Sequence, residues 1–155
     1  MHPSVERVAA AAAAKGLNLE IRETAGARSS EDAARAVGAP VGRIVKSLVF
    51  ILSGSDLPLL LLVSGSNRVD EARLAAHVGG AVRRASAEEV REATGFAIGG
   101  VSPFGATGDV QILMDEDLFA HPTVWASAGT PLHVFEIVPL ALRSATGAAV
   151  LVLKA

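Results

Sequence analysis

The sequence predicts a mixed α/β fold, in which helices pack around a curved mixed β-sheet or a barrel. Two segments, residues 43–52 and 57–63, are rich in β-branched and large apolar residues, as buried strands are. The polar turn at 53–56 joins them as a hairpin. The strands and helices predicted along the chain do not alternate strictly, which argues against a doubly wound parallel fold. We expect residues 1–155 to form one domain, with a sheet buried on much of both faces.

Capping residues predict where the helices begin. Ser30 is expected to cap a short helix that runs to Val37, and Asp70 a helix that ends at His77. Ser86 with Glu89 three positions later forms a capping box, in which each side chain satisfies a backbone donor of the other residue. The remaining predicted elements are helices at 4–15 and from Pro139 onward, and strands at 17–23, 81–85, 110–114, 123–129, 132–138 and 148–153.

Composition excludes several classes of protein. Hydrophobic residues make up 50% of the chain and charged residues 19%, which is a globular rather than a disordered composition. Cysteine is absent, which excludes disulfides, thiolate catalysis and cysteine-ligated zinc. No apolar segment approaches the roughly 20 residues that span a bilayer, so we expect a soluble, cytoplasmic protein. The net charge of -2 argues against wrapping a long nucleic acid, but it allows a local basic patch for one end of an RNA.

Lys46 is the unusual residue of the first apolar strand. The chain has 11 arginines and three lysines, and of these lysines only Lys46 lies inside a strongly apolar run. An ammonium in this setting must reach water, pair with an anion or line a cavity that receives one. Lysine is a compact point charge suited to phosphate or carboxylate. The alternative interpretation is a lysine on an edge strand that discourages pairing with another sheet.

Residues 96–108 form the second unusual segment, which we call the glycine loop. Four glycines and one proline in this stretch exclude a regular element. Glycine lets the backbone come close to a ligand, and proline stiffens the loop that presents it. An elaborate surface connection is the alternative. A third polar cluster at 127–133 completes the candidate set, and together the three segments predict a pocket for a small anionic or ester-bearing ligand.

Other common sites are absent from the sequence. No Walker phosphate loop occurs, and Gly99-Gly100 does not match the dinucleotide fingerprint. The four histidines show no metal-ligand spacing, and no nucleophile elbow supports a Ser-His-Asp triad. We therefore expect no metal and no cofactor.

The chain resembles the YbaK/ProX (YbaK/EbsC) family of aminoacyl-tRNA editing domains, which includes the editing insertion of bacterial prolyl-tRNA synthetases. Residues 44–50 resemble the family's lysine strand, and 63–65 with 68–70 resemble the strand, loop and helix that follow it. Residues 85–96 and the Gly-Gly-Val-Ser-Pro-Phe-Gly segment at 99–105 resemble its helix and signature loop. Asp115-Glu116 and Ala128-Gly129 complete a match that covers nearly the whole chain.

The resemblance implies a YbaK-like fold and hydrolysis of the ester that links a wrong amino acid to the 3′ end of a tRNA. It implies a trans-editing deacylase acting on tRNA(Pro) charged with cysteine or alanine, with prolyl-tRNA synthetase as a possible partner. Lys46 would orient the substrate, and the glycine loop would shape the aminoacyl pocket and help to position water. Carried over, the catalytic residues are Lys46, Gly100 and Ser102, and the substrate-binding residues are Ser47, Gly99, Val101, Pro103, Phe104, Ser127, Gly129 and His133.

Two positions depart from the subgroups of the family. Members that remove alanine often carry asparagine where this chain has Ser47, and members that remove cysteine tend to have Ser-Gly-Gly where it has Ser127-Ala128-Gly129. The amino acid removed therefore stays open, because a size sieve discriminates weakly per methylene. Two other hypotheses remain: a non-catalytic module that binds tRNA or a synthetase through the same pocket, and a hydrolase of some other small ester. The oligomeric state is not indicated by the sequence.

Overall fold

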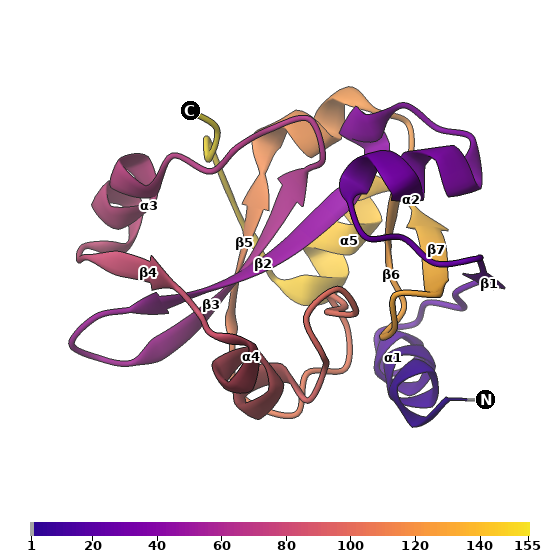
Figure 1. Cartoon of the computed structure of the whole chain (residues 1–155), viewed down its shortest axis with the longest axis horizontal. Helices are drawn as coiled ribbons and strands as arrows, with labels where there is room; N and C mark the ends of the chain where they lie inside the picture. Colours follow the sequence, from indigo (N-terminus) through magenta and orange to yellow (C-terminus); the bar gives the residue numbers. More distant parts are fainter. Residues whose placement is uncertain (1) are drawn as a thin grey trace.

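Two β-sheets with helices around them make up the molecule (Figure 1). The computed structural model describes residues 2–155. One sheet has the strand order β4-β2-β3-β5-β8 and the other the order β1-β7-β6. The strands are β1 (Ile21–Glu23), β2 (Val45–Leu52), β3 (Leu57–Ser64), β4 (Val82–Arg84), β5 (Gln111–Asp115), β6 (Val124–Ser127), β7 (His133–Ile137) and β8 (Ala149–Leu151).

Five α-helices and two 3₁₀ helices connect these strands within the described residues. None of those helices has the length and apolar composition needed to cross a membrane. The helices are α1 (Pro3–Ala14), α2 (Ser30–Val37), α3 (Glu71–Val78), α4 (Ala87–Thr94), α5 (Pro139–Thr146), η1 (Val41–Arg43) and η2 (Glu116–Ala120).

The predicted mixed α/β class is confirmed, but the strands form two sheets and the described chain closes no barrel. The larger sheet is itself mixed, because β2 pairs antiparallel with β3 and β4 whereas β3 and β5, like β5 and β8, pair in parallel. The smaller sheet is antiparallel throughout. An isolated parallel bridge between Ile44 and Trp125 links the two sheets just before β2.

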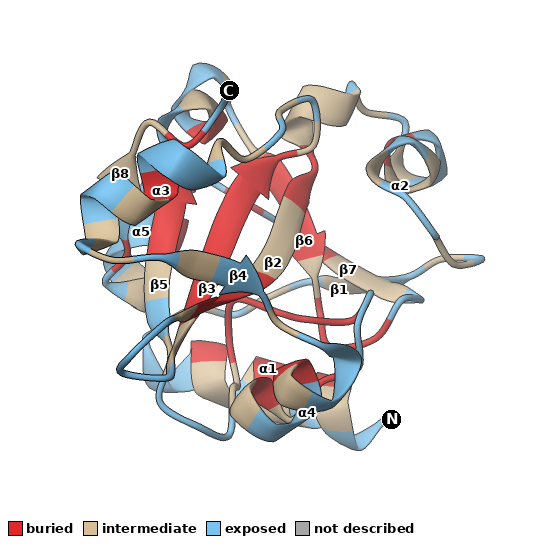
Figure 2. Ribbon diagram, turned by 60° about the vertical axis from the view of Figure 1, so that its left-hand side comes forward, coloured by how far each residue is buried: buried red, intermediate tan, exposed pale blue. Residues whose placement is uncertain are grey.

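The central hairpin is buried on both faces, as predicted. Alternate residues of a strand point to opposite faces. In β3, Leu59 and Leu61 pack with Leu74 of α3 on one face, while Leu60 and Leu62 pack with α1, α4 and the smaller sheet on the other. Figure 2 shows this buried band running through β2, β3 and β5, with the exposed side of α3 outside it. The hairpin is therefore the rigid element on which the cavity described below is built.

Capping residues set the helix starts as predicted, with one correction. Asp70 caps α3, and Ser86 with Glu89 forms the capping box of α4. The cap of α2 is Ser29 rather than Ser30, because the extended backbone of Ser29 lets its hydroxyl accept a hydrogen bond from the Asp32 amide at 3.1 Å. Either serine satisfies the capping pattern in sequence, so the pattern alone does not choose between them.

The first predicted strand is shorter than expected. Only residues 21–23 of the segment 17–23 pair, with residues 133–135 of β7. Leu17 and Leu19 still pack against the core, although no strand pairs with them in the described chain. The alternation of apolar and polar residues at 17–23 therefore predicted correctly which side chains pack on the core, but it overestimated how many residues pair with another strand.

Candidate active site

A cavity of about 290 Å³ opens beside the first half of β2. On this side of β2, β4 pairs only with residues 50–52, and the Ala85 amide donates one further hydrogen bond to the Val49 carbonyl at 3.0 Å. The Ile44–Trp125 bridge marks the other limit. Between these two points, no described strand pairs with residues 45–48 on this side. The residues that line the cavity come from β2 and from α2, the glycine loop and the smaller sheet; Figure 1 labels α2, β6 and β7.

Lys46 lines this cavity. Its amine donates a hydrogen bond to the backbone carbonyl of Asn67 at 2.6 Å. No carboxylate of the described chain lies within 4.0 Å of the amine. Burial lowers the pKa of Lys46 from its ordinary value of 10.5; the charge of Glu31 opposes this shift, and Arg84 and Arg68 add to it. Lys46 thus lines the cavity without an ion-pair partner in the described chain, and its amine is held by the carbonyl of Asn67, a residue outside the lining.

Ser47 adds an unsatisfied polar atom to the same wall. Its hydroxyl oxygen is buried and has no hydrogen-bond partner among residues 2–155, although the residue lines the cavity. A buried polar group without a partner costs about 1–3 kcal/mol and calls for an explanation. A bound ligand that accepts or donates a hydrogen bond at this point supplies one.

The glycine loop reaches the cavity through residues 98–101. Ile98, Gly99 and Val101 line it. Gly100 lies between them and packs against the next loop, since a Cβ at this position would stand 2.9 Å from the Thr130 Cα. A side chain at residue 100 would therefore separate the two loops that form this wall. Gly99 has a φ of 88°, a conformation that favours glycine.

Ser102, Pro103 and Phe104 lie behind the wall rather than on it. All three are buried, and they are absent from the cavity lining. The Ser102 hydroxyl accepts a hydrogen bond from the Phe104 amide at 3.2 Å, and the Phe104 ring centroid lies 5.8 Å from that of Phe135. In this structure these three residues support the loop and are absent from the cavity lining, whereas the family resemblance implied that they contact the substrate.

The third predicted cluster forms the opposite wall. Ser127, Thr130 and His133 line the cavity. The Nδ1 atom of His133 lies 2.6 Å from the Thr130 hydroxyl, and its Nε2 lies 3.3 Å from a carboxylate oxygen of Glu23. Both ring nitrogens are thus engaged. Gly129 faces away from the cavity, because a Cβ there would stand 2.8 Å from the Ser4 carbonyl of α1.

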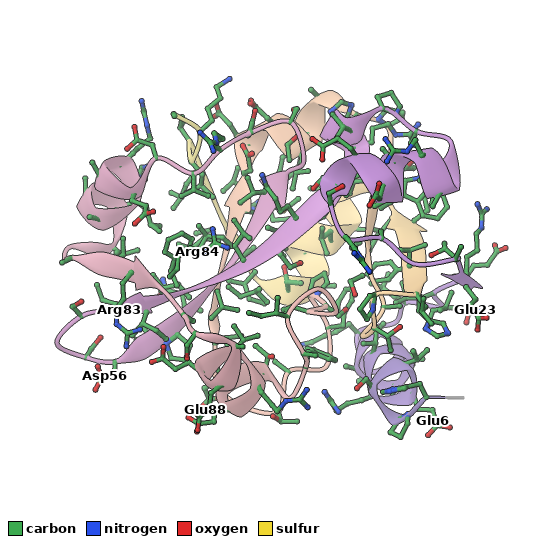
Figure 3. All side chains as sticks on the ribbon, viewed as in Figure 1. Glu6, Glu23, Asp56, Arg83, Arg84 and Glu88 are labelled. Atoms are coloured by element: carbon green, nitrogen blue, oxygen red, sulfur yellow. The ribbon has the colours of Figure 1, made fainter. Side chains whose placement is uncertain are left out.

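Several lining residues were not predicted from the sequence. Arg84 comes from β4, with its guanidinium carbon 5.5 Å from the centroid of the Phe50 ring, and Figure 3 labels it. Arg28 comes from the segment before α2, and with Lys46 these side chains place basic groups around the cavity. No signal in the sequence separated them from other surface arginines. The remaining lining residues that lie outside the three predicted segments include Ala33, Val90 and Trp125.

Residues 2–155 contain no group of three or more His, Cys, Asp or Glu side chains arranged to hold a metal ion. The polar side chains of the lining are instead one lysine, two arginines, one histidine and several hydroxyl groups. Cations and hydroxyl groups of this kind are suited to an anionic or ester-bearing ligand.

Fold and cavity together define an α/β protein with one cavity that is lined by a lysine on a strand and by a glycine loop. The chain belongs to the aminoacyl-tRNA editing domain family, whose family model matches residues 24–145. The resemblance indicated by the lysine strand and the signature loop is thereby confirmed.

Known proteins similar to the chain agree with this assignment. A crystal structure described as that of a candidate trans-editing enzyme for prolyl tRNA synthetase is 46% identical, with a TM-score of 0.94, and the match covers 100% of this chain and 99% of that one. The uncharacterized protein YwhH of Bacillus subtilis (strain 168) is 35% identical over 109 residues, 70% of this chain and 69% of that protein. The proline–tRNA ligase of Limosilactobacillus fermentum is 33% identical over 101 residues, 63% of this chain but only 18% of the ligase.

Proposed function

We propose that this protein is a trans-editing hydrolase that removes the amino acid from misacylated tRNA. The observation that carries the proposal is that Lys46, Gly99 and Val101 line one cavity. The family and the similarity to a candidate trans-editing enzyme support the same activity. The 3′ acceptor end of the tRNA would enter the cavity with its aminoacyl ester.

The reaction is attack of water on the ester carbonyl, with the ribose hydroxyl of the terminal nucleotide as leaving group. Lys46 and Arg84 line the cavity and would hold phosphate oxygens of the acceptor end. The ammonium of lysine and the guanidinium of arginine are both suited to binding phosphate. The glycine loop would hold the aminoacyl group and the attacking water, helped by a hydroxyl of the terminal ribose. Aminoacyl esters are already activated, so positioning can supply much of the acceleration.

We propose tRNA(Pro) carrying cysteine or alanine as the substrate. The cavity of about 290 Å³ lies at the lower end of the range for small-ligand pockets, which is about 300–1,000 Å³. Small side chains such as Val101 and Ala126 contribute to its wall, which suits a small aminoacyl group. Similarity to segments of proline–tRNA ligases supports tRNA(Pro), and prolyl-tRNA synthetase is the partner we propose.

A panel of misacylated tRNAs tests the proposal. Purified protein is incubated with tRNA(Pro) charged with cysteine, alanine or proline, and with other mischarged tRNAs, in the presence and absence of prolyl-tRNA synthetase. We expect release of cysteine or alanine and retention of proline. If every tRNA stays charged under both conditions, the deacylase assignment is wrong. Tight tRNA binding without release would instead identify a non-catalytic binding module.

A further inference from the structure

The loop between β3 and α3 contains a side chain that connects the cavity to two acidic residues. The side-chain amide nitrogen of Asn67 donates to Asp115 Oδ2 at 2.9 Å and to Asp117 Oδ2 at 2.8 Å. The backbone carbonyl of the same residue accepts the hydrogen bond from the Lys46 amine at 2.6 Å. Asn67 therefore stands between the cation of the cavity and a pair of carboxylates at the end of β5.

These two carboxylates are themselves held in place. Asp115 is fully buried, and its two oxygens accept hydrogen bonds from the Ser64 amide and the Asp117 amide, each at 3.0 Å. Asp117 forms an ion pair with Lys154 at 3.0 Å. The hydrogen bond from Asn67, and then that from Lys154, lower the pKa of Asp117, so this carboxylate is charged at neutral pH. Hydrogen bonds from an amide to charged carboxylates are stronger than neutral ones, so Asn67 is firmly anchored.

Lys46 needs such an anchor. Its side chain is a flexible four-carbon stem with a single charged atom at the end, and it has no carboxylate partner within 4.0 Å in the described chain. The acceptor that holds its amine is the Asn67 carbonyl, which comes from a loop 21 residues away in sequence. The position of that carbonyl depends on the two carboxylates that hold the Asn67 side chain.

We propose that Asn67 is a positioning residue for Lys46: its side chain, fixed by Asp115 and Asp117, sets the carbonyl that directs the lysine amine at the cavity. The catalytic consequence of this inference rests on the proposed deacylase function. The positioning itself is independent of that function and is testable without substrate.

Competitive amine labelling tests the positioning. The protein is treated with a limiting amount of acetic anhydride, and acetylation of Lys46 is measured by mass spectrometry relative to Lys15, an exposed lysine at the end of α1. In Asn67→Ala the backbone carbonyl remains, but the side chain that fixes its position is gone, so its hydrogen bond to the amine is weakened. The charged form of the amine is then less favoured, and we expect Lys46 to react several times faster than in the wild type. Lys154→Met removes only the outer ion pair of Asp117, and we expect it to leave Lys46 reactivity unchanged.

Asp117→Ala is the second variant, in case Asn67→Ala does not fold. It removes one of the two carboxylates that hold the amide, so a smaller rise in Lys46 reactivity is expected. Wild-type or lower reactivity of Lys46 in the folded variants would overturn the inference. Equal rises in Lys154→Met and Asn67→Ala would also overturn it, because they would show general loosening of this region.

Deacylation kinetics test the consequence. Under single-turnover conditions on a tRNA that the wild type deacylates, Asn67→Ala is expected to lower the rate about 10- to 100-fold, as misplacement of a positioning group does. In a Lys46→Ala background the same substitution should add no further loss, because both changes act through one amine. An equal further loss in that background would show that Asn67 acts separately. A wild type without activity would contradict the proposed function, while the labelling result would still decide the positioning.

Discussion

The two halves of β2 have different neighbours, although they belong to one continuous strand. Residues 49–52 have β3 on one side and β4 with Ala85 on the other. Residues 45–48 keep β3 as a neighbour, but the structure describes no strand on their other side, and the cavity lies there. Because β4 pairs only with residues 50–52, the edge of residues 45–48 is left unpaired on this side and forms one wall of the cavity.

The side chains of the two regions also differ in how they are satisfied. Beside the packed half, Leu59 and Leu60 of β3, which pair with Phe50 and Val49, are fully buried and contact other apolar side chains. Within the described residues, the cavity half carries a lysine without an ion-pair partner and a serine whose hydroxyl has no hydrogen-bond partner. The polar groups that lack such partners therefore lie in the cavity half.

The largest expected effect is in the packed region. Leu59→Ala should lower the free energy of unfolding by about 2–5 kcal/mol, because Leu59 pairs with Phe50 of the packed half and its side chain is buried between β2, β5 and α3. Chemical denaturation measures this loss. Leu132→Ala, at a side chain that is 43% exposed, is the matched control and should change stability little. Equal losses in the two variants would remove the contrast between the packed region and the rest of the chain.

Lys46→Met should have the opposite profile. It keeps the apolar stem and removes the charge, so the unfolding midpoint should change little, while the rate of deacylation should fall about 100-fold. Lys15→Met, a change at an exposed lysine, serves as the control for both measurements. Large destabilisation with retained activity would mean that Lys46 belongs to the structural half of the comparison.

Ser47→Ala sharpens the comparison at a single atom. The Ser47 hydroxyl has no partner in the free protein, so its removal should leave stability unchanged or raise it by about 1 kcal/mol. If a ligand supplies the partner, affinity for a non-hydrolysable aminoacyl-adenosine should fall about 2- to 10-fold. Calorimetry measures both quantities, and the exposed Ser53→Ala is the control. A clear loss of stability would show that the hydroxyl supports the fold.

The smallest effect is expected at the surface near β4. The forked ion pair with Arg83, at 2.7 and 2.8 Å, is the main cause that lowers the pKa of Glu89 from 4.5 to about 2. Because the pKa of Glu89 is lower in the folded state than in the unfolded state, its carboxylate stabilises the folded protein above pH 4.5. This contribution disappears as the pH falls toward 2.

Glu89→Gln should therefore lower the thermal midpoint slightly at pH 7 and should match the wild type near pH 2. Glu88→Gln, at the exposed neighbour that Figure 3 labels, is the control. A difference that grows toward low pH would contradict the assignment.

Local signals in the sequence predicted most of the fold. The apolar run of the hairpin, the caps at Asp70 and Ser86 and the glycine stops depend on nearby residues, and the structure agrees with them. The predicted strand boundaries were wrong where the length of a strand depends on a partner strand that is distant in sequence. Residues 17–20 alternate like a strand, but β7 reaches only to residue 21 of β1.

The candidate site was predicted in part for the same reason. Lys46 and Gly99 stand out because lysine in an apolar strand and clustered glycines are unusual in any context. Ser102 stands out equally, yet its side chain is fully buried and does not line the cavity. No local pattern in the sequence shows which side chains of a loop face a cavity and which face the core. Asn67 carries no signal, because its role depends on carboxylates about 50 residues away in sequence.

The bridge between Ile44 and Trp125 has a consequence for the width of the cavity. Its walls come from both sheets, with Ser47 on one and Ser127 on the other, and the bridge lies at their junction. Ala34 of α2 packs against both residues of the bridge, Ile44 and Trp125, but does not line the cavity itself. The side chain at residue 34 can therefore influence the width of the cavity from outside its lining.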